Sequence, residues 1–281
     1  MGVGGAGGSS LPEPQADLPR NGPVVVGILL AGGELKGSLA EGRPAQPKAC
    51  LEVAGTSLLE HTLRPLCEAQ SLSSIVVVGP AEMEHVVAAT APHARWAESG
   101  DSLVENLLQG VAEAPEADYV LAVSADLPLL DPTEVDFFVG QASTREAEFV
   151  YSMVERRVCG AAYPGTERTC VTIREGTFTG GNIMLMSRAM VQRNAQLIRD
   201  VFELRKKPWS LCRMLGWTFV LRLLCHRLTA NQASERVGEL LGCRATVVRA
   251  GASVAFDVDK PADLALAEQL LRQPEASAAT S

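Results

Sequence analysis

The apolar residues of this chain fall into short β-branched runs that alternate with segments of helical periodicity. Apolar runs predict buried, parallel-type strands at residues 23–31 (PVVVGILLA), 73–79 (SSIVVVG) and the start of 118–132 (DYVLAVSADLPLLDP). Apolar residues three or four apart predict helices at 56–70, 81–91 and 102–114, the last capped by Asp101 or Ser102. This alternation favours an α/β domain with a mostly parallel sheet and right-handed connections.

The second half of the chain first continues this pattern and then departs from it. Further strands are expected at 146–154, 169–178, 180–187, 245–250 and 252–259, and a final helix at 260–271. Residues of about 190–243 have helical character instead. We therefore predict one domain over 23–273 with a helical insertion at about 190–243. Gly-, Pro- and Ser-rich composition predicts a disordered leader at 1–22, and the tail at 274–281 is also expected to be disordered.

Length, charge and cysteine content narrow the class of protein. With 281 residues and 47% hydrophobic content, the chain can bury a large core. Its net charge of −8 disfavours nucleic acid as a partner, although a nucleotide that arrives with Mg²⁺ is compatible with it. The seven cysteines lack metal-ligand spacing, so we expect reduced, mostly buried thiols in a cytoplasmic protein.

One strongly apolar stretch, at 208–228, raises the question of a membrane. It carries Arg213, Arg222, His226 and Arg227, and four such residues argue against a transmembrane span. A helical lid or a homodimer contact is the favoured interpretation, and binding to a membrane surface is the alternative.

A glycine turn and a later lysine are the first candidates for chemistry. Gly32 and Gly33 end the first strand, where open α/β sheets bind ligands and where glycine lets backbone N–H groups approach a phosphate. Lys48 follows a proline and could reach back to that strand end, as could the mobile Lys36 or Arg43. An ordinary strand-end turn and a solvated lysine are the alternatives.

Three aspartates are the candidate metal ligands. Asp126 ends an apolar strand, and Asp257 and Asp259 are two residues apart in the predicted strand 252–259, where their side chains share a face. Mg²⁺ prefers carboxylate oxygens together with substrate phosphates. Helix capping is the alternative for Asp126 and Asp259, and Asp131 also has the position of a cap.

Polar loops supply candidates for substrate contacts. Gly100, Ser102 and Asn106 lie at a loop-to-helix start that could contact a base or a phosphate, although capping explains Ser102 equally well. Gly181 and Asn182, in the stretch TGGNI, could bind a second polar substrate. The nearby arginines Arg168 and Arg174 are candidates for the same role.

Taken together, five segments resemble one family. LAGG, PKACLEVAGTSLLEHTL, SADLPLL, GGNI and FDVDKPADLALAEQLL, in this order, resemble the nucleotidyltransferases of the nucleotide-diphospho-sugar transferase fold. The similarity is greatest to the NTP-transferase-domain group that includes molybdenum-cofactor cytidylyl- and guanylyltransferases. It covers roughly residues 24–271 except the helical stretch. It implies a Rossmann-like three-layer sandwich of the GT-A type.

The resemblance also implies roles for individual residues. The turn Leu30-Ala31-Gly32-Gly33 would wrap the base and phosphates of an NTP, Lys48 would bind the phosphates, and residues Gly100 and Ser102 would contact the base. Asp126 would hold Mg²⁺, with Asp259 best matched as a second ligand. The family's arginine close behind the glycines is missing from ELKGSLAEGRPAQ, where Lys36 is the expected substitute.

The implied reaction is transfer of an NMP from the NTP to a phosphorylated or hydroxylated small-molecule acceptor, with release of pyrophosphate. Gly181, Asn182 and Arg168 are the expected acceptor contacts. Two alternatives remain open. The altered glycine loop fits a relative that binds nucleotide without turnover, and Asp257-Val258-Asp259 fits the DxD metal motif of a glycosyltransferase.

Overall fold

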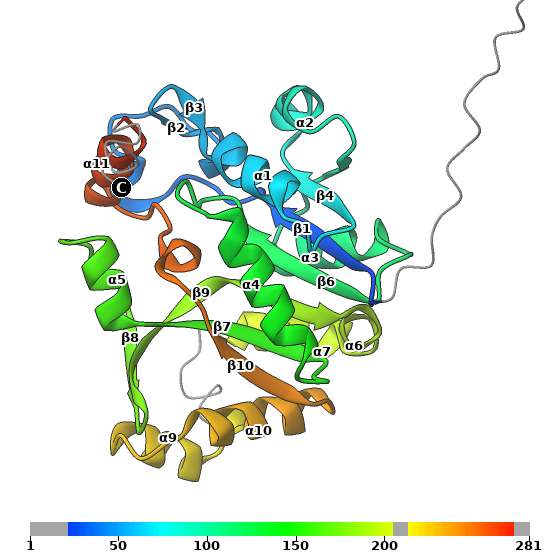
Figure 1. Cartoon of the computed structure of the whole chain (residues 1–281), viewed down its shortest axis with the longest axis vertical. Helices are drawn as coiled ribbons and strands as arrows, with labels where there is room; N and C mark the ends of the chain where they lie inside the picture. Colours follow the sequence, from blue (N-terminus) through cyan, green and yellow to red (C-terminus); the bar gives the residue numbers. More distant parts are fainter. Residues whose placement is uncertain (1–21, 205–212, 273–281) are drawn as a thin grey trace, which may run out of the picture.

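The computed structural model describes residues 22–204 and 213–272. An eight-stranded sheet in the order β10-β7-β9-β6-β1-β4-β5 forms its centre, and β8 pairs with the first part of β9 (Figure 1). The strands of this sheet are β1 (Val25–Leu30), β4 (Ser74–Gly79), β5 (Arg95–Glu98), β6 (Tyr119–Ser124), β7 (Phe149–Glu155), β8 (Cys170–Ile173), β9 (Gly176–Ser187) and β10 (Ala245–Arg249). Only β9, among these strands, runs against the others, which confirms the predicted mostly parallel sheet.

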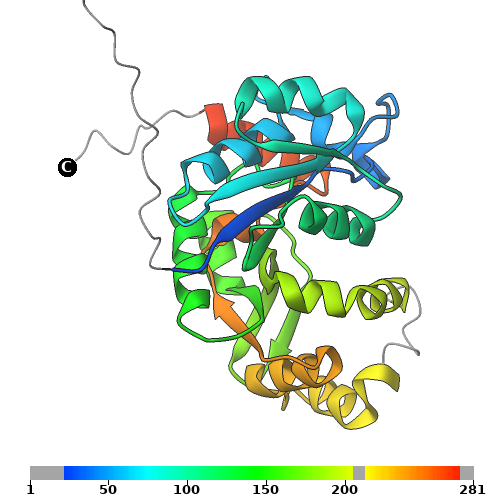
Figure 2. The same ribbon diagram turned by 90° about the vertical axis from the view of Figure 1, so that its right-hand side faces the viewer.

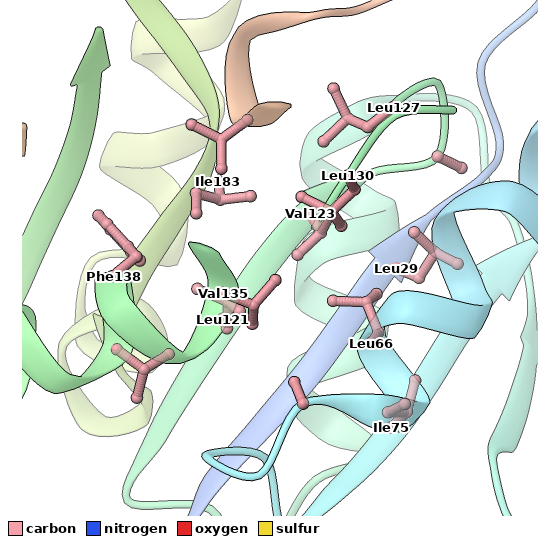
Figure 3. Packing of buried hydrophobic residues seen from close by; sticks show 14 of the residues in the cluster. Leu29, Leu66, Ile75, Leu121, Val123, Leu127, Leu130, Val135, Phe138 and Ile183 are labelled. Carbon is pink, nitrogen blue, oxygen red and sulfur yellow. The ribbon is translucent and has the colours of Figure 1, made fainter. Parts of the chain in front are cut away.

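Helices cover both faces of the sheet (Figures 1 and 2). Successive side chains of a strand point to opposite faces of the sheet, so each strand contributes apolar residues to a core layer on either side. On one face Leu29, Leu121 and Ile183 pack under α1 and α4, as Figure 3 shows around Leu66 and Phe138. On the other face Val26, Ile28 and Val120 pack with α3 and α6. The helices of these layers are α1 (Leu58–Glu68), α2 (Glu84–Thr90), α3 (Leu103–Ala112), α4 (Pro132–Ser143) and α6 (Arg188–Arg193).

A third apolar cluster joins an early and a late segment of the chain. Leu39 and Leu51, from the segments that follow β1, pack with Phe256, Val258 and Leu264 near the last helix. The elements around this cluster are β2 (Glu52–Val53), β3 (Thr56–Ser57), α11 (Pro261–Arg272) and the 3₁₀ turns η1 (Gly37–Leu39), η2 (Lys48–Cys50) and η4 (Ala252–Ala255). Burying these residues holds the C-terminal loop beside the segment that carries Lys48.

Local signals explain where the main helices begin. Ser57 and Glu60 form a capping box at the start of α1, and Ser102, rather than Asp101, caps α3 by accepting a hydrogen bond from the Glu105 amide. Asp131 caps α4 through the Thr133 amide, at 2.8 Å, as its position suggested.

Several predictions from the pattern are wrong. The expected strand 169–178 is a hairpin of β8 and the start of β9, because Gly176, at φ 142°, allows the chain to turn back. The expected strand 252–259 is η4 followed by an irregular loop, because Phe256 and Val258 pack in a separate apolar cluster with Leu39 and Leu51. The short β5 and α5 (Arg156–Ala162) had no counterpart in the prediction, and the expected helix 81–91 begins with the 3₁₀ turn η3 (Ala81–Met83) before α2.

The stretch expected to be helical contains α6, α7 (Ala195–Leu204), α9 (Trp217–Leu224) and α10 (Ala230–Leu241). Residues 208–212 of the apolar stretch, like the predicted disordered segments apart from Gly22, lie outside the described residues. In the described part of the chain, no helix combines the length and the apolar character needed to cross a bilayer. The limits of the domain and of the insertion stay predictions.

The expectation of mostly buried cysteines is also wrong. Of the six cysteines in the described ranges, only Cys159 is buried, whereas Cys67 and Cys225 are exposed. All six are free thiols. A cysteine is small enough to be tolerated at half-buried positions, so its apolar character alone does not place it in a core.

Candidate active site

The glycine turn and Lys48 are joined by the backbone. The Lys48 amide donates to the Gly33 carbonyl at 2.8 Å, and the Leu35 amide donates to the Gln46 carbonyl at 3.3 Å. The polar loop between them therefore closes on itself and returns the chain to the end of β1. Lys48 begins η2 and does not stand at the edge of the main sheet, yet it reaches the strand ends as the sequence predicted.

The ammonium of Lys48 lies between two carboxylates. Its Nζ donates to Asp126 Oδ2 and, at 2.6 Å, to Asp259 Oδ1, and its side chain is 16% exposed. Burial by itself would lower the pKa of Lys48, but the charges and hydrogen bonds of Asp126 and Asp259 outweigh it and raise that pKa. Lys48 is thus a cation, and the alternative of a solvated surface lysine is wrong.

The three predicted aspartates converge. One carboxylate oxygen from each of Asp126, Asp257 and Asp259 lies within 4.8 Å of the other two. Asp126 also accepts a hydrogen bond from Ser124 Oγ at 2.5 Å, and its carbonyl accepts one from the Val258 amide at 3.1 Å. Asp126 and Asp259, for which helix capping was the alternative, both bind Lys48 with their side chains. They therefore face one another across the site.

Burial affects the acids of this cluster differently. Burial raises the pKa of Asp257 to about 7, the charges of Asp126 and Asp259 add to the rise, and Arg168 opposes it. Burial also acts to raise the pKa of Asp259, but its bond to Lys48 prevails and lowers that pKa. The cluster therefore holds both a strongly ionised carboxylate and one that is costly to ionise.

A second loop meets the glycine turn. Asn106 is buried, its Oδ1 accepts the Gly100 amide at 2.7 Å, and its amide nitrogen lies against Gly32. Ser102 uses its hydroxyl to cap α3. The structure therefore brings Gly100 beside Gly32, whereas the contact of Gly100 and Ser102 with a base stays a prediction.

The remaining candidates are less central. Leu30 and Ala31 are the end of β1 and the residue after it, and Lys36 is exposed and paired with Glu34 at 2.9 Å. Gly181 is buried against Ser152, and Asn182 donates to the Val254 carbonyl at 3.4 Å, next to the loop of Asp257. Arg168 binds Asp257 and is 10% exposed, so contact with an acceptor is a prediction that the geometry leaves untested.

Some contributors were missed by the sequence analysis. Ser124, the last residue of β6, precedes Asp126 by two residues. Asp263, in the first turn of α11, follows Asp259 by four residues. Their spacing from the predicted ligands was the only available signal. Asp263 accepts the amides of Asp259 and Lys260 at 3.2 and 2.9 Å, so it organises the loop.

These donors suit a divalent cation. Hard cations take carboxylate oxygens, and three are gathered here. Asp126, Asp257, Asp259 and Asp263 face two cations, Lys48 and Arg168, which leaves two negative charges uncompensated when all are ionised. A divalent cation would offset that charge.

A parallel α/β sheet with a glycine turn, a lysine and clustered aspartates at its carboxyl edge defines a protein of the nucleotidyltransferase class. Comparison with known proteins agrees with this class. The model of the MobA-like NTP transferase domain matches residues 27–214, and the chain belongs to that family. The predicted enzyme class, a nucleotidyltransferase, is confirmed at this level.

Individual relatives extend the comparison. A curated 2-C-methyl-D-erythritol 4-phosphate cytidylyltransferase of Acidobacterium capsulatum is 28% identical over 185 residues, which are 60% of this chain and 77% of that protein. A structure described as a hypothetical transferase from Thermus thermophilus is 33% identical, with a TM-score of 0.76 over 86% of this chain and 99% of its own. A 4-diphosphocytidyl-2C-methyl-D-erythritol synthase from Anaerococcus prevotii shares the fold, with 12% identity, a TM-score of 0.56 and coverage of 90% and 98%.

Proposed function

We propose that this chain is a Mg²⁺-dependent nucleotidyltransferase that transfers an NMP from an NTP, CTP being the first candidate, to a small-molecule acceptor and releases pyrophosphate. The observation that supports the proposal most directly is the convergence of Lys48, Asp126, Asp257 and Asp259 beside the glycine turn. CTP comes first because the curated relative is named a cytidylyltransferase. The proposed acceptor is a small soluble molecule that carries a phosphate or hydroxyl oxygen. The enzyme is proposed to act in the cytoplasm without binding a membrane.

The proposed reaction forms one P–O bond and breaks another. An acceptor oxygen attacks the α-phosphorus, and the bond from that phosphorus to the oxygen bridging it to the β-phosphorus breaks, so pyrophosphate leaves with the electron pair. If the acceptor group is a hydroxyl, its proton goes to solvent or to a nearby carboxylate. No covalent intermediate with the protein is needed, so positioning and charge neutralisation carry the catalysis.

The residues of the site divide this work. In the turn Leu30–Gly33 the Ala31 amide donates to the Val78 carbonyl, so the N–H groups of Gly32 and Gly33 are the ones that approach the nucleotide, with Lys36, Gly100 and Ser102 as further contacts. Lys48 has a flexible stem, so its ammonium can leave Asp126 or Asp259 and bind a phosphate as a point charge. Gly181 and Asn182 are the proposed acceptor side of the site, whereas the guanidinium of Arg168 is engaged by Asp257.

Three aspartates would hold the metal: Asp126, Asp257 and Asp259. When bound, Mg²⁺ supplies positive charge that offsets the charge of the phosphate oxygens. The chain's own contribution is to keep three carboxylates close together although they repel one another, using Lys48 and Arg168 as counter-charges.

The test is a pyrophosphate-release assay with each of the four NTPs, Mg²⁺ and a panel of phosphorylated and hydroxylated acceptors. Asp126→Asn should abolish turnover. The matched control is Asp131→Asn, five residues further along the same strand-end segment, where the carboxylate caps α4. Full activity of Asp126→Asn would refute the metal assignment.

The products separate the alternatives. Release of a nucleoside diphosphate from a nucleotide sugar would identify a glycosyltransferase that uses the Asp257–Asp259 pair. Nucleotide binding, measured by a rise in melting temperature with NTP and Mg²⁺, without pyrophosphate from any acceptor would identify a relative without turnover.

A further inference from the structure

A nearly buried arginine lies behind the metal-binding aspartates. Arg168 comes from the segment between α5 and β8, 89 residues before Asp257, and its side chain is 10% exposed. One guanidinium nitrogen, Nη1, donates to Asp257 Oδ1, and the other, Nη2, lies 3.6 Å from Asp263 Oδ1. The guanidinium carbon also lies 5.1 Å from the centre of the Phe256 ring. Arg168 therefore contacts three residues of the C-terminal loop.

The second carboxylate extends this contact to Asp259. Asp263 is 2% exposed, and its other oxygen, Oδ2, accepts the backbone amides of Asp259 and Lys260. Arg168 thus binds Asp257 directly and faces the group that holds the backbone of Asp259. Phe256, on which the guanidinium packs, is fixed in turn by the ring of Tyr163, with centroids 4.6 Å apart.

We propose that Arg168 is a positioning residue of the carboxylate cluster, which keeps Asp257 and the loop of Asp259 turned toward Asp126 so that a divalent cation can bind. This inference rests on the proposed function. Arg168 does not itself contact the metal. Its contribution is a fixed orientation of ligands that belong to different parts of the chain.

The shape of the guanidinium is the reason why an arginine serves here. A planar group with donors on two sides can bind two carboxylates while one face packs on an aromatic ring. A lysine offers one compact charge and can satisfy only part of this arrangement. Without Arg168, Asp257 and Asp263 lose the cation that they share, and Asp257 is left beside the carboxylates of Asp126 and Asp259 with no guanidinium next to it.

Removing Arg168 has two opposing effects on a bound cation. Loss of a positive charge favours the cation, whereas loss of ligand orientation disfavours it. Substituting a group that orients metal ligands commonly weakens metal affinity by about 10-fold to 100-fold. We expect orientation to dominate, because three oxygens from the turn after β6 and from the irregular loop after η4 must meet within 4.8 Å.

The test measures Mn²⁺ binding by EPR, with Mn²⁺ alone and with Mn²⁺ plus CTP, on the full chain. Arg168→Gln should weaken Mn²⁺ affinity by about 10-fold or more, and Arg168→Lys should recover part of it. The matched control is Arg95→Gln, which removes another arginine–carboxylate pair, with Glu116, on β5. The control should leave Mn²⁺ affinity at the wild-type value, and circular dichroism should show that each variant is folded.

Each outcome has a distinct meaning. If wild-type protein binds no Mn²⁺, with or without CTP, the proposed metal site is wrong. If wild-type protein binds Mn²⁺ and Arg168→Gln binds it equally or more tightly, the positioning role is wrong while the proposed function stands. If Arg168→Gln does not fold, Arg168→Lys decides, since wild-type affinity in that folded variant would also overturn the role.

Discussion

Replacing Gly32 by alanine should destabilise the protein, whereas the same change at the neighbouring Gly33 should not. A Cβ atom at Gly32 would lie 2.7 Å from Ser99 Cβ and closer still to the side-chain nitrogen of Asn106. A Cβ atom at Gly33 would meet no atom within 4 Å. The pair therefore separates steric crowding from the general effect of replacing glycine.

The neighbours of Gly32 cannot move away at little cost. The Ser99 amide donates a hydrogen bond to the Gly79 carbonyl at 2.7 Å, and the buried Asn106 accepts one from the Gly100 amide. Overpacking of a tight site costs about 1–3 kcal/mol. For a domain of this size, each kcal/mol lowers the melting temperature by roughly 2–4 °C, so a decrease of about 2–12 °C is expected.

Thermal and urea unfolding followed by circular dichroism measure this difference. Gly33→Ala should melt close to the wild-type temperature. Equal melting temperatures for the two variants would show that Ser99 and Asn106 give way, and the tight contact of Gly32 with these two residues would then be refuted. Asn106→Ala should cost less stability in the Gly32→Ala background than in the wild type, because only there does it also remove one of the two crowding atoms.

Two further predictions concern charged groups. Lys48→Met should weaken CTP affinity, measured by calorimetry, about 10-fold or more, since a hydrogen bond to a charged group is worth about 1.5–3 kcal/mol. The same variant should bind Mg²⁺ alone more tightly, because the ammonium no longer binds Asp126 and Asp259. Unchanged CTP affinity would exclude the phosphate role. Asp136 accepts the amides of Gln70 and Ser71; burial opposes its ionisation, but these bonds prevail and lower its pKa. Asp136→Ala should therefore cost about 1–2 kcal/mol of unfolding free energy in urea at pH 7, and this cost should vanish as the pH falls through the lowered pKa of the native carboxyl, below the ordinary value near 4. A cost that is independent of pH would assign it to packing.

The parts of the fold that could be read from the sequence are those with a local cause. A run of β-branched residues such as that in β1 must be buried, and Ser57 with Glu60 begins a helix through bonds within four residues. The hairpin of β8 and β9 and the turn η4 were missed because they depend on which neighbouring strands are free to pair. Pairing between distant segments leaves little trace in local hydrophobic periodicity.

The site shows the same division. The sequence by itself determined that a glycine turn, Lys48 and three aspartates stand next to apolar segments, where side chains can reach the carboxyl edge of a parallel sheet. Only the tertiary structure decided that Asp126 and Asp259 share Lys48, that Arg168 faces Asp257 and Asp263, and that Asn106 joins Gly100 to Gly32. The physical reason is that charge pairing depends on distance in space. Lys48 and Asp259 are far apart in the sequence and become neighbours only when the apolar cluster around Phe256 brings an early and a late segment of the chain together.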